Sequence, residues 1–220
     1  KEPISDLQVP EPLVPEVIEG KASVPKAARI GFALDLDNRV QVGDWKTEGR
    51  VTAVDAQKLT FITAKGKEGN LVFRWPKEFQ MPVKTNEMIT IRRIAQPYQG
   101  AMEKKVSIES DDKLAVNYGR VFGAEPKQVQ LSKDMKIVQT RDSGIILNQS
   151  KFEITRQIPV VFVADGRSKP LEIGKIHQVR VGGQKFKVLI SSSIHVAPTP
   201  AFEGVAEGSG YVLEYVLTRE

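Results

Sequence analysis

The sequence has no cysteine, only two histidines, few aromatic residues and no long hydrophobic run. Without cysteine the chain cannot hold a disulfide, a zinc finger built on thiolates or a cysteine nucleophile. The longest uncharged apolar runs, such as residues 158–164, are far shorter than the roughly 20 residues that a membrane-spanning helix needs. These absences imply a fold that depends on its hydrophobic core alone, and they say little about compartment.

The composition is that of a folded globular protein, with 220 residues of which 40% are hydrophobic and 27% charged. No stretch longer than about 11 residues carries a helical stripe, whereas short alternations of apolar and polar residues recur along the chain. We therefore predict an all-β protein built of one or two small antiparallel barrel or sandwich modules.

The predicted strands share a period-two alternation that is bounded by turn residues. They cover residues 29–36, 49–55, 58–64, 71–75, 87–95, 104–110, 135–140, 144–148, 151–165, 175–181, 184–196 and 210–220. The stretch 111–123 fits either a strand or a short helix. The clearest hairpin covers residues 177–190, because Gly182 and Gly183 permit the positive φ angles of a tight turn between two alternating apolar arms.

Prolines at positions 3, 10, 12, 15 and 25 predict an extended arm over residues 1–28. This arm would act as a tether from an anchor or another domain, or would dock in part on the body through its apolar residues. Strand signals weaken over residues 110–151. We therefore place one β module at 29–125 and a second at 126–220, with a single continuous sandwich as the alternative.

The net charge of +5 is mild, and its most suggestive feature is a set of basic residues near one tyrosine and one glycine hairpin. The candidate binding residues are Arg92, Arg93, Tyr98, Lys104, Lys105, Arg180, Lys185 and Lys187. Gathered on one wall of a small barrel, such residues would suit single-stranded nucleic acid. A surplus of this size is also typical of an ordinary protein surface.

The leads for catalysis are weak. His177 and His195 lack partners at the spacing of metal ligands, and Ser193 lies on a strand without a nucleophile elbow. The tripeptide at 142–144 precedes both histidines, which is the wrong order for a chymotrypsin-like enzyme, and its residue types favour a turn. The sequence therefore predicts no catalytic residue, metal or cofactor.

We expect a non-enzymatic binding or assembly protein that acts through β-strand surfaces outside the cytoplasm. The proline-rich leader, the many strands and a start without methionine suggest a processed protein of a bacterial periplasm or envelope, with a signal peptide or lipid anchor upstream. Its partner would be an envelope protein or polysaccharide. The alternatives are a nucleic-acid-binding small β-barrel and a hydrolase with a carboxylate-based site that includes Asp142.

Overall fold

The computed structural model describes residues 30–36, 44–98, 101–140, 144–198 and 209–220. Within these ranges the chain forms sixteen strands and no helix, which confirms the predicted all-β class. The strands are β1 (Gly31–Leu36), β2 (Trp45–Val54), β3 (Lys58–Thr63), β4 (Glu68–Arg74), β5 (Met88–Tyr98), β6 (Ala101–Ser110), β7 (Lys113–Gly123), β8 (Gln128–Ser132), β9 (Met135–Gln139), β10 (Ile145–Gln149), β11 (Glu153–Gln157), β12 (Val160–Ala164), β13 (Arg167–Leu171), β14 (Ile176–Val181), β15 (Gln184–Pro198) and β16 (Gly210–Arg219). The predicted arm over residues 1–28 lies outside the described residues.

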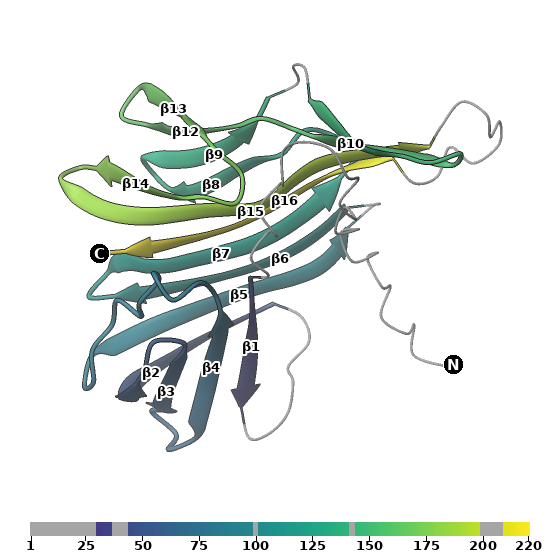
Figure 1. Ribbon diagram of the computed structural model, residues 1–220. Helices are drawn as coiled ribbons and strands as arrows, with labels where there is room; N and C mark the ends of the chain where they lie inside the picture. The colour runs from purple at the N-terminus through teal and green to yellow at the C-terminus, as the bar shows by residue number, and fades with distance from the viewer. Residues whose placement is uncertain (1–29, 37–43, 99–100, 141–143, 199–208) are drawn as a thin grey trace, which may run out of the picture.

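The strands form two antiparallel sheets. Eleven strands of the large sheet follow the order β1-β4-β3-β2-β5-β6-β7-β16-β15-β11-β10, and β14 pairs with β15 as the twelfth. The small sheet has the order β13-β12-β9-β8. Figure 1 shows the small sheet on one side of the long central strands, with β1–β4 on the other side. Both sheets are open, so the sandwich form of the prediction holds and the closed-barrel form does not.

The stretch that the sequence left undecided is strand β7, which lies in the middle of the large sheet between β6 and β16. Residues 115–119 are all buried, because core side chains cover both faces of the sheet at this point. Period-two alternation is therefore lost along β7. The β6–β7 turn has positive φ angles at Asp111 (50°) and Asp112 (59°), which a primed hairpin turn requires.

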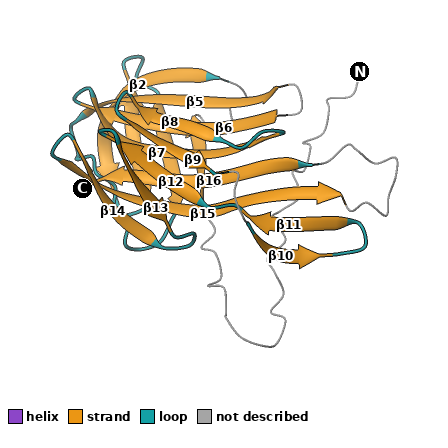
Figure 2. Ribbon diagram, turned by 90° about the horizontal axis from the view of Figure 1, so that it is seen from above, coloured by secondary structure: helices purple, strands orange, loops and turns teal. Residues whose placement is uncertain are grey.

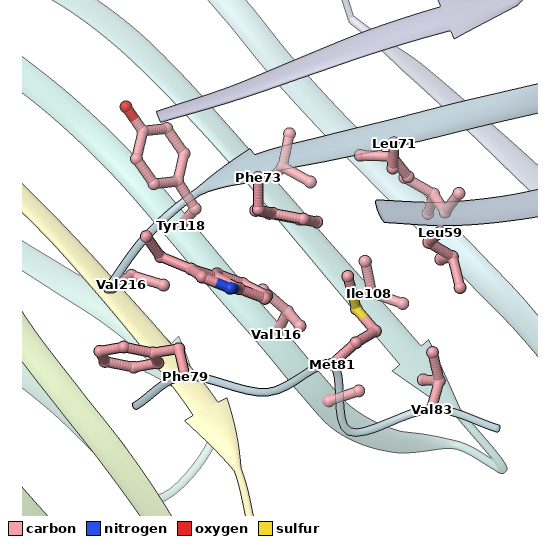
Figure 3. Packing of buried hydrophobic residues seen from close by; sticks show 14 of the residues in the cluster. Leu59, Leu71, Phe73, Phe79, Met81, Val83, Ile108, Val116, Tyr118 and Val216 are labelled. Carbon is pink, nitrogen blue, oxygen red and sulfur yellow. The ribbon is translucent and has the colours of Figure 1, made fainter. Parts of the chain in front are cut away.

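The hydrophobic core is divided between the two faces of the large sheet. On β7, Val116 and Tyr118 belong to the core beneath β1–β4, whereas Val121 belongs to the core beneath the small sheet. Figure 3 shows the first core, with Phe73 among its residues. The Phe73 ring stacks on the Trp75 ring with centroids 4.4 Å apart. The molecule is thus a three-layered sandwich around the long central strands.

The predicted strand over residues 151–165 is split in the structure. Its first part is β11 in the large sheet and its second part is β12 in the small sheet, with Ile158 and Pro159 between them. Proline has no N–H with which to continue a ladder, so the chain leaves one sheet and enters the other here.

A buried polar network joins the two sheets beside this crossing. The Gln139 side-chain amide donates to Ser193 Oγ at 3.0 Å and to the Val212 carbonyl at 2.9 Å. In turn, Ser193 Oγ donates to the Ile158 carbonyl at 2.7 Å. The small sheet is therefore held in a defined position on the large one.

The large sheet contains strands from both sides of the predicted module boundary, because β7 pairs with β16 over eight residue pairs. The division into modules at 29–125 and 126–220 stays a prediction. The predicted hairpin over 177–190 is confirmed as β14 and the first part of β15, with φ angles of 55° at Gly182 and 81° at Gly183.

Candidate binding surfaces

The basic residues of β5 and β6 lie on two opposite faces of the large sheet. Arg93 is directly opposite Val106, a residue of the core beneath β1–β4, so it lies on that face. Lys104 shares this face, whereas Arg92 and Lys105 point to the other, because successive side chains alternate along a strand. Tyr98 ends β5, and its side chain lies outside the described part of the chain.

Arg93 lies in a partly buried position. Burial lowers the pKa of its guanidinium, and the nearby Asp44 carboxylate partly opposes this effect. Its Nε is buried and has no hydrogen-bond partner within the part of the chain that the structure describes. Arg93 therefore differs from the exposed Arg92 beside it, and the two do not form one basic patch.

Lys104 is directly opposite Arg120 on β7, which in turn is opposite Glu214 on β16. Arg120 Nε lies 4.0 Å from Glu214 Oε2, and the Tyr118 hydroxyl donates to the same oxygen at 3.2 Å. Ser191 Oγ donates to Glu214 Oε1 at 2.7 Å. The Glu214 carboxylate thus interacts with three neighbouring side chains, and its charge neutralises that of Arg120. These contacts indicate a structural role for Glu214 and Arg120.

The same cluster shifts the pKa of Tyr118. Burial raises the pKa of the Tyr118 phenol, and the adjacent Glu214 carboxylate raises it further. The Tyr118 side chain is almost completely buried, so ionisation of its hydroxyl would place a second negative charge beside Glu214 in the sheet. Tyr118 is accordingly a hydrogen-bond donor at neutral pH.

The basic residues of the glycine hairpin differ in their surroundings. Arg180 and Lys185 are directly opposite one another and exposed. Lys187 instead donates to the Glu78 carbonyl at 3.1 Å and pairs with Glu220 at 3.7 Å. Four strand spacings separate β5 from β15, a distance of about 19 Å. The structure therefore does not bring the two predicted basic groups together.

The β10–β11 hairpin forms one end of the large sheet and lies at the margin of the molecule (Figure 2). It carries large apolar side chains that are strongly exposed, namely Ile145 (65%), Ile146 (51%) and, in the connecting turn, Phe152 (59%). Among the described strands β10 pairs with β11 alone, so its other edge presents backbone N–H and C=O groups. An open edge with exposed isoleucines is typical of a strand-pairing surface.

A row of polar and aromatic side chains continues from this hairpin across the sheet. Arg156 on β11 is opposite both Ile146 on β10 and His195 on β15. The His195 and Tyr211 rings stack with centroids 4.2 Å apart. Burial lowers the pKa of His195, and the positive charge of Arg156 lowers it further.

An open cleft of about 510 Å³ lies between β13 of the small sheet and β14 of the large one. Arg167 and Lys169 line it from β13, and Arg180 lines it from β14. Arg180 is the one predicted binding residue that lines this cleft. Arg167 and Lys169 were missed by the sequence analysis, although Pro170 next to them signals an edge strand.

The residues considered for catalysis have other partners in the structure. The His177 ring accepts a hydrogen bond from the Glu172 N–H at 2.8 Å, and Ser193 belongs to the network between the sheets. Asp142 and Ser143 lie outside the described residues. Within the described ranges, no group of three His, Cys, Asp or Glu side chains is placed to hold a metal ion, and no helix is long and apolar enough to cross a membrane.

No protein-family model, curated protein or solved structure matches this chain.

Proposed function

We propose that the protein is a non-enzymatic binding or assembly component that pairs with an extended segment of a partner protein along the edge of β10. The observation that carries this proposal is the combination of an open strand edge with the exposed side chains of Ile145 and Ile146. In strand addition, backbone hydrogen bonds supply affinity and alternate side chains supply selectivity. β10 offers both.

The uncharged sequence of β10 supports a binding role for this edge over a merely structural one. Edge strands that only need to remain unpaired usually carry charges, prolines or bulges that block pairing. β10 carries no charged residue, since its sequence is Ile-Ile-Leu-Asn-Gln. It does contain a register shift between Ile146 and Asn148, which limits an added strand to part of its length.

We further propose that the protein works outside the cytoplasm, as a component of a bacterial envelope. Support for this part comes from the proline-rich segment over residues 1–28 and a fold made of strands. Cell fractionation that follows the natural gene product tests it directly. Recovery of the protein only in the cytosolic fraction would contradict it, while leaving the edge-pairing proposal intact.

Site-specific photo-crosslinking tests the edge-pairing proposal. A photoreactive residue at Gln149, which is exposed on β10, is expected to capture a partner protein in the cells of origin. The same residue at Lys77, exposed in the loop after β4, serves as the control and should not capture this partner. The variant Ile146→Lys should abolish capture at Gln149, because a lysine on the open edge blocks strand addition. Capture that survives this substitution would contradict the proposal.

A further inference from the structure

The cleft between β13 and β14 is framed by two neighbouring segments of the chain that belong to different sheets. The loop 172–175 joins the two strands at one end. At the other end the Gly182 N–H approaches Asp165 Oδ2 at 3.5 Å, which brings the two hairpin tips together. Between these ends, Lys169 Nζ crosses the cleft and donates to the Gln178 carbonyl at 3.0 Å. The buried side chains of Phe162 and Val179 lie at its base.

The backbone of β14 faces into this cleft. Val181 and Gln184 flank the two-residue turn and form a hydrogen-bonded pair. Hydrogen-bonded and non-hydrogen-bonded pairs alternate along an antiparallel ladder, so the N–H and C=O groups of Gln178 and Arg180 point away from β15. The bond from Lys169 to the Gln178 carbonyl agrees with this direction. On the opposite side, β13 pairs with no described strand besides β12, and Pro170 is tolerated there because its nitrogen lies on the open edge.

The cleft also carries unbalanced positive charge. Arg167, Lys169 and Arg180 line it with Asp165 as the single acid. All three cations are on exposed residues. Among the ion pairs between described residues, none involves Arg167 or Arg180. A ligand with regularly spaced carboxylates would neutralise these cations.

We propose that this cleft is a second binding site, separate from β10, that takes an extended acidic peptide segment. The backbone groups of Gln178 and Arg180 match the repeat of an extended chain, and the cations that line the cleft match its acidic side chains. The strands that line the cleft have five and six residues, so the segment held would be of similar length. Single-stranded nucleic acid fits less well, because stacking needs an accessible ring and Phe162 is only 3% exposed.

Fluorescence anisotropy with the full chain tests this inference. The probe is a short labelled peptide of alternating Glu and Val, and the comparison probes are its Lys-Val counterpart and a labelled oligothymidine. The acidic peptide should bind, with an affinity that falls as NaCl is added. The double variant Arg167→Glu, Arg180→Glu should weaken binding roughly tenfold or more, because two attractions become repulsions.

The matched control is Lys77→Glu, Lys84→Glu, which makes the same change in net charge at two exposed positions outside the cleft. It should stay within roughly twofold of the unmodified protein, because screened surface charges at a distance contribute little. Hydrogen exchange provides a second readout, since the bound acidic peptide should protect the Arg180 amide. Failure of the acidic peptide to bind, equal losses in both double variants, or tighter binding of oligothymidine at the same cleft would each overturn the inference. None of these results depends on β10.

Discussion

Gly119 on β7 and Tyr215 on β16 are directly opposite one another, and the tyrosine ring occupies the space that a side chain at position 119 would need. A Cβ at position 119 would lie 2.6 Å from Tyr215 Cζ. The ring is fully buried, and its hydroxyl donates to Asn117 Oδ1 at 3.0 Å. The absence of a side chain on one central strand therefore allows a large aromatic residue on the next.

Gly119→Ala is expected to lower the free energy of unfolding by about 1–3 kcal/mol, because the added methyl group overpacks the site. Chemical denaturation measures this loss. In a double-mutant cycle, Tyr215→Leu should remove part of the penalty, since the smaller side chain vacates the contested space. Simple additivity of the two substitutions would show that the contact is not the cause.

Gln139→Leu is expected to cost about 3 kcal/mol or more of stability. The substitution leaves the Val212 carbonyl and the Lys127 N–H without their bonds to Gln139 and removes a bond to Ser193, and each buried polar group without a partner costs about 1–3 kcal/mol. Hydrogen exchange should show faster opening of the small sheet than of β5–β7. Gln128→Leu, an exposed position on β8, is the control and should change little.

The lowered pKa of His195 predicts a specific pH dependence. The ring stays neutral in the folded protein at a pH where an unfolded chain, with an ordinary pKa of about 6.5, already takes up a proton. This contribution to stability is complete above about pH 6.5 and is lost as the pH falls through and below that value. Denaturation midpoints measured from about pH 8 down to pH 5 should show the decline.

Two variants separate this effect from general acid sensitivity. His195→Gln should flatten the decline in stability at low pH. Arg156→Gln should raise the pKa of His195 in an NMR titration, because it removes a positive charge that disfavours protonation of the ring. A His195 pKa at or above about 6.5 in the unmodified protein would contradict the prediction.

The sequence predicted the architecture where one face of a strand meets the core and the other meets water. It predicted the 177–190 hairpin because glycine is tolerated at the positive φ angles of Gly182 and Gly183. It could not decide on β7, where Ala115 and Val116 are buried in succession and the alternation disappears. It also joined β11 to β12, since nothing in a periodic pattern says that Pro159 marks a change of sheet.

The candidate surfaces were harder to predict, because they depend on which strands become edges. Consecutive basic residues such as Arg92 and Arg93 must point to opposite faces of a strand, and this rule could have divided the predicted patch from the sequence alone. Ile145 and Ile146 resemble core residues in the sequence. Their exposure follows from the position of β10 at the end of the strand order, which is a long-range property of the fold.

Strand β15 is long enough to lie beside both the cleft between β13 and β14 and the β10–β11 hairpin. Residues 184–189 pair with β14 beside the cleft, and residues 194–198 pair with β11 beside the hairpin, while β16 is bonded to it from 186 to 196. From Lys185 to Ile194 an extended chain covers about 30 Å. The strand thus fixes the separation between the two surfaces. A single ligand that binds both must span this distance, and a shorter ligand can bind only one of them.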